Sequence, residues 1–321
     1  MIILISNRDI ATTWRDTAAL TFDPVIQQFI TTLDISKKTQ ETLFRENPAS
    51  MVQRENKFAS LLVKEDPMHH AFCHLQMEWV KQQLSGNMLA DIVFSATKAL
   101  FGSEMLEVDP RFPEFYFGFE EAAWKISNNN AHTICFWTIS HIITSPSLLA
   151  SVRTETSKAC SPSGSVDLTI LTNHCPQLDA IWHEVLRLYT AVSLIRVAIQ
   201  KTSINGKIIN KGDQVMSPTR QSHLNRELFG SDATELHPER FLKDKKLANQ
   251  KGYHPLGGGN TYCPGRFLAK QEVYTLVALM LYRFDIDVED GSLPTVNAAE
   301  PSLGAMRPMG NIRVKVSARK L

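Results

Sequence analysis

The sequence lacks several features that would place a protein in a class by themselves. It has no run of about 18 apolar residues, so no transmembrane helix is evident. Its net charge is +1, so neither sign dominates, which disfavours nucleic acid or anionic lipid as a partner. The five cysteines form no CxxC pair and no Cys/His zinc spacing, which disfavours a zinc site and a disulfide framework. Hydrophobic residues make up 43% and charged residues 21%, values usual for a globular core.

The pattern along the chain predicts a mainly α protein with a minor β part. Apolar spacing predicts helices over 68–86, 120–143, 178–189 and about 264–282. Alternation and β-branched residues predict strands over 195–199, 207–209 and 311–316, with a hairpin at Asn205-Gly206. The apolar start, Met1–Asn7, is too short for an anchor and indicates a buried strand. We expect a single domain over 1–321, in which 1–115 is an N-terminal helical part and 116–321 carries the functional motifs.

Four of the cysteines, Cys73, Cys135, Cys160 and Cys175, are expected to be small buried hydrophobes. Cys263 differs because of its neighbours. Three glycines precede it, and a glycine backbone can lie flat against a planar ligand. Pro264 after it is typical of a helix start, where N–H groups stabilise a thiolate. A thiolate ligates haem iron. A glycine-rich loop before a helix can instead bind phosphate, but the Lys-Ser/Thr of a P-loop and a preceding strand are both missing.

Two further motifs accompany this loop. Glu184 and Arg187 are spaced i,i+3 on a predicted helix, where the alternative is a solvated surface pair of little energetic value. Arg240 lies further on, within Pro238-Glu239-Arg240-Phe241. If this distant arginine joins the pair, the three side chains form a buried charge network that fixes one geometry for the loop.

In this order, the three motifs resemble those of the cytochrome P450 family. The segment from Tyr253 to Phe267 resembles its FxxGxxxCxG signature, Glu184/Arg187 its ExxR helix, and 238–241 its PERF segment. The resemblance implies the P450 fold, iron-protoporphyrin IX (haem) as cofactor, an apolar small-molecule substrate and NADPH-cytochrome P450 reductase as redox partner. Cys263 would be the iron ligand, and Arg196 would pair with a haem propionate unless it is an ordinary surface strand residue. The implied cofactor-binding residues are Arg196, Gly257, Gly258, Gly259, Cys263 and Gly265.

The sequence departs from the family pattern at two site positions. Leu256 stands where the family usually has Phe, which should retune the iron rather than abolish binding. Asn130 stands where the oxygen-binding helix usually has Thr, and no carboxylate precedes it. This helix resembles the branch that includes cholesterol 7α-hydroxylase, prostacyclin synthase and many fungal secondary-metabolite enzymes. Asn130 is the catalytic candidate, because an amide both donates and accepts hydrogen bonds, with His132 and Thr133 as alternatives.

A third departure is length. Compared with the family, the chain starts after the expected membrane anchor, and the F, G and H helices that roof the substrate pocket are missing. The expected Trp-xxx-Arg propionate contact is also missing from 68–86, where His69, His70 and His74 lie instead. The resemblance leaves the location open between the cytoplasm and the periphery of the endoplasmic reticulum.

Three functions therefore stay open. The first is a haem-thiolate monooxygenase that oxidises an apolar small molecule in fungal secondary metabolism. The second is a haem-thiolate isomerase or dehydratase that needs no reductase. The third is a non-catalytic remnant that keeps the haem site without a closed pocket, because this chemistry requires water to be excluded.

Overall fold

The computed structural model describes residues 1–3, 9–10, 12–13, 18–21, 24–25, 130–162, 165–259, 262–263, 265–289, 292–298 and 304–319. The helix expected over 68–86 lies outside these residues, and so do positions 120–129 of the next expected helix. The chain divides into two compact units. Unit 1 comprises Met1–Ala59, Ala180–Arg266 and Ala298–Met306, and unit 2 comprises Ser60–Asp179, Phe267–Asn297 and Arg307–Leu321.

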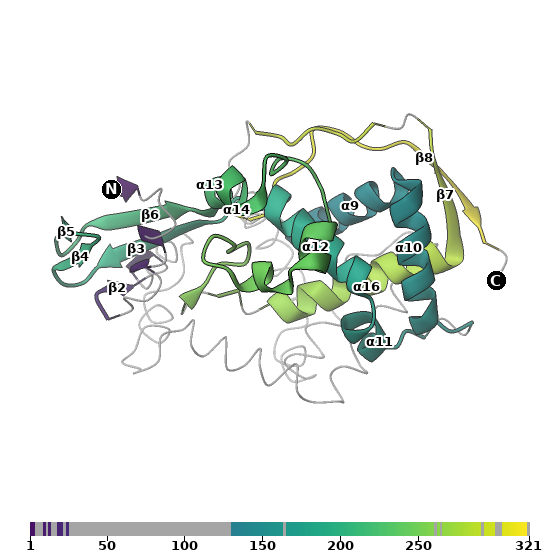
Figure 1. The fold of residues 1–321 in the computed structure, drawn as a ribbon, viewed down its shortest axis with the longest axis horizontal. Coiled ribbons are helices and arrows are strands. Elements are labelled where there is room, and N and C mark those ends of the chain that lie inside the picture. The colour runs from purple at the N-terminus through teal and green to yellow at the C-terminus, as the bar shows by residue number, and fades with distance from the viewer. Residues whose placement is uncertain are drawn as a thin grey trace, which may run out of the picture. The chain divides into compact units, whose positions relative to one another are not determined.

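Unit 1 contains a four-stranded sheet. Its strands lie in the order β1 (Ile2–Ile3), β6 (Gln214–Pro218), β3 (Ser193–Ala198), β2 (Leu20–Thr21). Strands β3 and β6 are antiparallel and lie side by side (Figure 1). Burial alternates along β3, as expected for a strand with one covered face. The predicted strand over 195–199 is thereby confirmed, with its start two residues earlier.

A tight hairpin extends from this sheet. Strands β4 (Thr202–Ile204) and β5 (Lys207–Ile209) pair in antiparallel fashion. Asn205 and Gly206, which join them, have φ angles of 52° and 80°. A two-residue turn with positive φ at both positions matches the twist of the flanking strands, and Asn-Gly tolerates it best. The hairpin predicted from this dipeptide is confirmed.

The N-terminal strand is less buried than the sequence suggested. Ile2 and Ile3 form β1, but Ile3 is 55% exposed. The prediction of a buried strand is therefore wrong for Ile3, because among the described residues β1 pairs with β6 alone and lies at the edge of the sheet. Leu20 in β2 and Val215 in β6 instead supply buried side chains to the core of this sheet.

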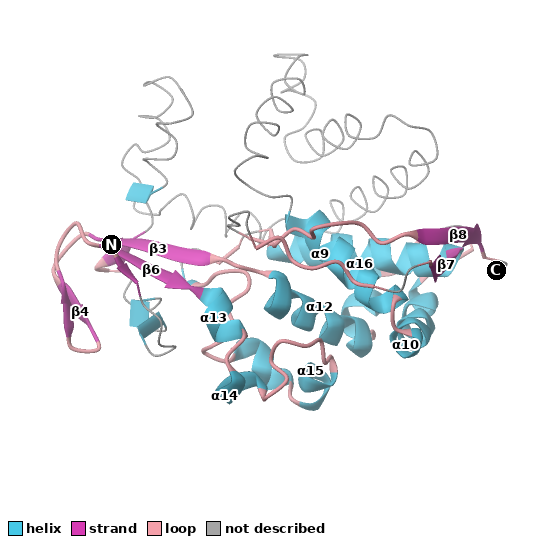
Figure 2. Ribbon diagram, turned by 90° about the horizontal axis from the view of Figure 1, so that it is seen from above, coloured by secondary structure: helices cyan, strands magenta, loops and turns pink. Residues whose placement is uncertain are grey.

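Short helices follow the sheet in unit 1. Figure 2 shows α13 directly after β6. These segments are α13 (Thr219–His223), α14 (Arg226–Phe229), α15 (Glu239–Lys243) and the 3-10 helix η2 (Lys245–Asn249). Two of them begin at side-chain caps, in which the carboxamide of Asn225 accepts from Glu227 N–H and Asp244 accepts from Lys246 N–H. Helices of four or five residues leave too little periodicity to be predicted, so the sequence indicated only a polar stretch here.

Helices dominate unit 2, and two helices are divided between the units. The helices are α9 (Asn130–Ile143), α10 (Pro146–Thr156), η1 (Ser157–Ala159), α11 (Leu168–Asn173), α12 (Pro176–Tyr189) and α16 (Arg266–Arg283). Helix α9 ends at Ile143, as expected from Ser145-Pro146. Helix α12 covers the range predicted over 178–189, and its predicted apolar face is buried. The prediction of a mainly α chain with a minor β part is confirmed for the described residues.

Helix ends in unit 2 are held by charged side chains from neighbouring elements. The carboxylate of Glu155 accepts hydrogen bonds from the backbone N–H groups of Gln177 and Leu178, at the start of α12. Asp179 accepts from Lys270 Nζ at 2.5 Å and from Tyr274 Oη at 2.8 Å, which ties α12 to α16. The contacts of Glu155 satisfy N–H groups that a helix leaves open at its start. The contacts of Asp179 hold the first turn of α12 against α16.

Replacing Arg153 with Met is expected to destabilise unit 2. Arg153 Nε donates to Leu281 O at 3.1 Å and Nη2 donates to Phe284 O at 2.9 Å, so α10 satisfies carbonyl groups at the end of α16. Met keeps the aliphatic length but leaves both carbonyls without this donor. We expect a loss of about 1–3 kcal/mol in the free energy of unfolding, measured by urea titration. Asp285→Asn is the control, because that carboxylate is 48% exposed and its ion pair with Arg153 contributes little.

A two-stranded sheet completes unit 2. Strand β7 (Phe284–Val288) pairs antiparallel with β8 (Val314–Ala318), and the two lie side by side in Figures 1 and 2. The predicted strand over 311–316 is thus confirmed with a shift of its start to Val314. Strand β7 was missed, although Phe-Asp-Ile-Asp-Val alternates as a strand does, because it continues directly from α16 without a turn signal between them.

Among the described residues, no single helix is long and apolar enough to cross a membrane. One bent helix pair, Thr133–Ile143 and Pro146–Ala159, reaches the required length and composition only when both parts are counted together.

Candidate functional site

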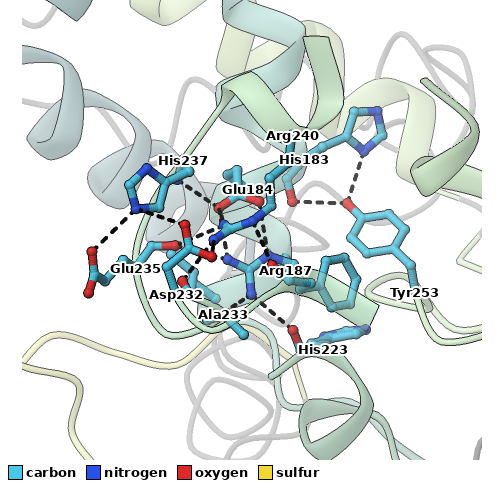
Figure 3. A network of polar contacts seen from close by, with 12 residues as sticks. His183, Glu184, Arg187, His223, Asp232, Ala233, Glu235, His237, Arg240 and Tyr253 are labelled. Carbon is cyan, nitrogen blue, oxygen red and sulfur yellow. Dashed lines mark hydrogen bonds and ion pairs between the residues drawn. The ribbon is translucent and has the colours of Figure 1, made fainter. Parts of the chain in front are cut away.

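A buried ion pair lies on the last turns of α12. The side chains of Glu184 and Arg187 are both fully buried, and Arg187 contacts Glu184 through two parallel hydrogen bonds (Figure 3). The Nε–Oε1 and Nη2–Oε2 distances are 2.9 and 2.8 Å. Such bidentate pairing is the strongest geometry available to arginine and carboxylate. The solvated surface pair considered from the sequence is therefore excluded.

Arg187 uses all of its donors. Beyond Glu184, its Nη1 donates to His223 O at 2.9 Å and to Ala233 O, and its Nη2 donates to Glu235 O at 3.0 Å. Arginine has five N–H donors in a planar fork, and each has an acceptor here. A single guanidinium therefore holds three backbone carbonyls of the segment 223–235 against α12.

Arg240 completes the cluster. Its Nη1 lies 3.2 Å from Glu184 Oε2, its Nε donates to Phe229 O, and its Nη2 donates to Asp232 O. Arg240 also pairs with the carboxylate of Asp232, and this hydrogen bond lowers the pKa of Asp232. The structure thus brings together Glu184, Arg187 and Arg240, the three residues that the sequence grouped into one network.

Two histidines connect this cluster to the segment before the glycine loop. His183 Nδ1 lies 2.9 Å from Tyr253 Oη, and Tyr253 Oη donates to His183 O at 3.0 Å (Figure 3). The Phe241 ring packs on His183 and Tyr253, with centroids 5.1 and 5.3 Å away. His223, whose carbonyl is held by Arg187, accepts a hydrogen bond from His254 N–H at its Nε2, at 3.0 Å. Tyr253 is therefore held by His183 and Phe241, and the backbone of His254 is held by His223.

The glycine loop turns back on itself before Cys263. Gly257 and Gly259 have φ angles of 82° and 59°, a region that residues with a Cβ rarely adopt. The N–H of Cys263 donates to Leu256 O at 2.9 Å and closes the loop. Arg266 Nη1 donates to Cys263 O at 2.8 Å. Cys263 itself is partly buried and belongs to unit 1.

The helix after Cys263 begins later than predicted. Helix α16 starts at Arg266, whereas the sequence placed its start near Pro264, which lies outside the described residues. The carbonyl of Cys263 accepts from Arg266 N–H at 3.4 Å in a tight turn, so Cys263 precedes the helix by a three-residue turn. Gly265 stands in this turn with open space where a Cβ would lie.

The other described cysteines are thiols whose pKa values are raised by burial. Burial raises the pKa of Cys135 to about 12 and the pKa values of Cys160 and Cys175 to about 11 each. These groups stay protonated at neutral pH, and a thiol in that state is a poor ligand. The expectation of small buried hydrophobes fits Cys135 and Cys175, whereas Cys160 is partly exposed and Cys73 lies outside the described residues. The assignment of Cys263 as the iron ligand stays a prediction.

Arg196 lies in β3 with 5% of its surface exposed. Its position in the alternation places it on the same face as Leu194 and Ala198, which belong to the sheet core. The ordinary surface strand residue considered from the sequence is therefore excluded. A buried guanidinium requires acceptors, and its Nη1 donates to Ile195 O at 2.9 Å.

The remaining candidate site residues that the structure describes are Gly258, Asn130 and Thr133. Gly258 lies buried in the loop of unit 1, next to Gly257. Asn130 is the first described residue of α9, in unit 2, and its side chain is exposed. Thr133 follows on the same helix and is partly buried. The expected position of a haem between Asn130 and Cys263 stays a prediction.

Acid is expected to destabilise unit 1 through His223. Burial, with His254, Arg187 and Arg220 nearby, lowers the pKa of His223 from 6.5 to about 3. In the unfolded chain this imidazole takes up a proton below pH 6.5, whereas the folded chain resists it down to about pH 3. The contribution of the neutral His223 to the free energy of unfolding is therefore fully present above pH 6.5. It falls by about 1.4 kcal/mol per pH unit between pH 6.5 and 3. Urea titrations at pH 7 and 5 measure the loss.

The matched variant for this acid effect is His223→Gln, which keeps an acceptor but cannot take up the proton. The difference between the two chains isolates His223 from other buried histidines such as His141, whose pKa burial lowers to about 4. An equal loss of stability in both chains between pH 7 and 5 would contradict the assignment.

Sequence reasoning missed His183, His223 and Tyr253. These residues contact main-chain groups or one another across 31 to 70 positions of sequence. The pattern of neighbouring residues in the sequence does not indicate contacts over such distances.

Several known proteins are similar to this chain in sequence. A cytochrome P450 monooxygenase of Penicillium oxalicum is 33% identical to this chain over 169 residues, which cover 49% of this chain and 34% of the relative. A cytochrome P450 monooxygenase of Penicillium decumbens is 24% identical over 250 residues, covering 71% and 46%. The 7-alpha-hydroxycholest-4-en-3-one 12-alpha-hydroxylase of Oryctolagus cuniculus is 27% identical over 220 residues, covering 61% and 44%. The chain spans about a third to a half of the length of these curated relatives.

The family comparison covers the part of the chain that holds both the charge network and the glycine loop. The cytochrome P450 family model matches residues 128–316. This range includes Glu184, Arg187, Arg240 and Cys263. Because the match covers more than half of the 321 residues, the chain belongs to the cytochrome P450 family.

Proposed function

We propose that this chain holds haem through the Cys263 thiolate and acts as a monooxygenase on an apolar small molecule. One observation carries the proposal: Cys263 lies partly exposed directly after a loop in which Gly257 and Gly259 have positive φ angles, and the matched family model covers this loop. The positive φ angles of Gly257 and Gly259 permit a flat backbone without Cβ atoms, which fits a planar macrocycle. The residues present therefore fit a haem.

When bound through a thiolate, haem supplies the chemistry that inserts one atom of dioxygen into a substrate and reduces the other to water. Cys263 Sγ would hold the iron. The hydrogen bond from the backbone N–H of Cys263 to Leu256 O would fix the direction of the Cα–Cβ bond of Cys263. Arg196 would neutralise a propionate, because a buried guanidinium on β3 is suited to a carboxylate partner. The side-chain amide of Asn130 would donate a hydrogen bond to an oxygen ligand and accept one from water.

The substrate class and the redox partner belong to the same proposal. Relatives from Penicillium are named cytochrome P450 monooxygenases, and the relative from Oryctolagus cuniculus is named 7-alpha-hydroxycholest-4-en-3-one 12-alpha-hydroxylase. We infer an apolar substrate of fungal secondary metabolism and electrons from NADPH-cytochrome P450 reductase. Because no carboxylate directly precedes Asn130 in the sequence, proton delivery would rely on water held by the amide.

The test is the carbon-monoxide difference spectrum of the reduced, haem-supplied chain. We expect a Soret band at the position of thiolate ligation. Stoichiometric haem with only a neutral-ligand band, in folded protein, would overturn the proposal. With the spectrum established, oxygen consumption that depends on NADPH and reductase would support a monooxygenase. Turnover of a hydroperoxide without any electron donor would instead assign an isomerase or dehydratase.

A further inference from the structure

His223 lies where the charge network and the glycine loop meet. Its carbonyl accepts from Arg187 Nη1 at 2.9 Å, and its side-chain Nε2 accepts from His254 N–H at 3.0 Å. One residue therefore contacts the buried arginine with its backbone and the start of the loop with its ring. The side chain is completely buried, so water does not compete for either contact.

The hydrogen bond to His254 determines the protonation state of the ring. Because a backbone N–H donates to Nε2, this nitrogen carries no proton, and the single proton of the neutral imidazole sits on Nδ1. Nδ1 has no acceptor among the described residues. A protonated ring would present N–H groups at both nitrogens and would lose the bond to His254. The contact therefore exists only for the neutral ring with its proton on Nδ1.

The contact continues to the cysteine through the backbone. His254 is followed by Pro255, whose ring restricts the chain, and then by Leu256, whose carbonyl accepts from Cys263 N–H at 2.9 Å. Three hydrogen bonds therefore link Arg187 to Cys263: Arg187 to His223, His254 to His223, and Cys263 to Leu256. The backbone from 254 to 256 joins the last two. A shift of the 254–256 backbone would move the carbonyl that holds Cys263.

We propose that His223 is a positioning residue that sets the Cys263 loop through its Nε2 bond to His254 N–H. The claim rests on the proposed haem ligation by Cys263. His223 touches no cofactor in this scheme and acts through the loop backbone. Its contribution is to keep the sulfur in the position where it binds as a thiolate rather than as a neutral thiol.

Two substitutions separate the acceptor from the volume of the ring. In His223→Phe, the ring shape is kept and the acceptor is lost. In His223→Gln, the side-chain carbonyl lies near the position of Nε2 and can accept the same hydrogen bond. His174→Phe is the control for the same chemical change, since His174 is exposed at the end of α11. Urea titration establishes that each full-length variant is folded before the other measurements.

The first readout needs no haem. We expect amide hydrogen exchange in peptides covering 251–259 of the haem-free chain to accelerate about fivefold or more in His223→Phe, the size that follows from losing one hydrogen bond. His223→Gln and His174→Phe should exchange as the wild type does. Unchanged exchange in His223→Phe would overturn the proposal, whatever the state of the haem.

The second readout is the reduced carbon-monoxide spectrum. We expect the ratio of the thiolate band to the neutral-thiol band to fall about fivefold in His223→Phe and to recover in His223→Gln. Faster exchange with an unchanged spectrum would show that the bond exists without positioning the ligand, and would overturn the inference alone. A wild-type chain without a thiolate band would overturn the proposed function itself, and the positioning claim with it.

Discussion

Replacing Cys263 with Ser is expected to remove the thiolate band from the reduced carbon-monoxide spectrum completely. A serine hydroxyl is about the size of the thiol and can keep the N–H bond to Leu256 O, because that bond uses only the backbone. It does not supply the soft, ionisable sulfur on which this spectrum depends. The loop should therefore persist while the ligand is lost, and the unfolding free energy should change little.

The matched control for this variant is Cys160→Ser. Cys160 is also partly exposed, but burial raises its pKa to about 11, so it stays a thiol. This control should keep the full thiolate band. If Cys263→Ser retained that band while Cys160→Ser lost it, the ligand would have been assigned to the wrong residue. If both retained it, the ligand would be a cysteine other than these two.

The second large effect is expected for Arg187→Ala, which should fail to fold cooperatively around α12. The change removes five hydrogen bonds and leaves three backbone carbonyls without their donor. It also leaves the buried Glu184 with Arg240 as its remaining cation. Breaking a buried pair by removing one partner costs about 3–5 kcal/mol, a large share of the roughly 5–15 kcal/mol that stabilises a typical domain. Haem retention should be lost together with the near-ultraviolet circular dichroism signal.

Arg187→Lys should not rescue this loss. Lysine has three donors at a single point and cannot reproduce the planar fork that reaches two carboxylate oxygens and three carbonyls. The control is Arg226→Ala, which removes an exposed arginine of α14 in the same unit. We expect the free energy of unfolding of this control to lie within about 0.5 kcal/mol of the wild-type value. An Arg187→Ala chain that unfolded as cooperatively as this control would show that the network is dispensable.

Elements with strong local signals were predictable from the sequence. The Asn-Gly turn between β4 and β5 and the buried face of α12 follow from dihedral preference and helical spacing alone. The charge network was also predictable in its membership. Glu184 and Arg187 are one helical turn apart, and Arg240 supplies a second cation for a carboxylate that is buried.

The rest depends on contacts that local spacing does not encode. The carbonyl acceptors of Arg187 are backbone groups, so side-chain identity at Ala233 and Glu235 says nothing about them. His223 reads as one polar residue in a polar stretch, although tertiary packing buries it completely. The start of α16 was misplaced because a tight turn at the Cys263 carbonyl delays the helix to Arg266.

The way in which Arg187 is satisfied has a consequence for how this region tolerates change over evolution. Three of its five bonds end on main-chain oxygens between 223 and 235, which every amino acid provides. Point replacements in this stretch leave those oxygens in place, whereas an insertion or deletion moves them out of reach of a rigid guanidinium. The contacts of Arg187 therefore constrain the number of residues in this segment, whereas the side chains of His223 and Asp232 are constrained by their own contacts.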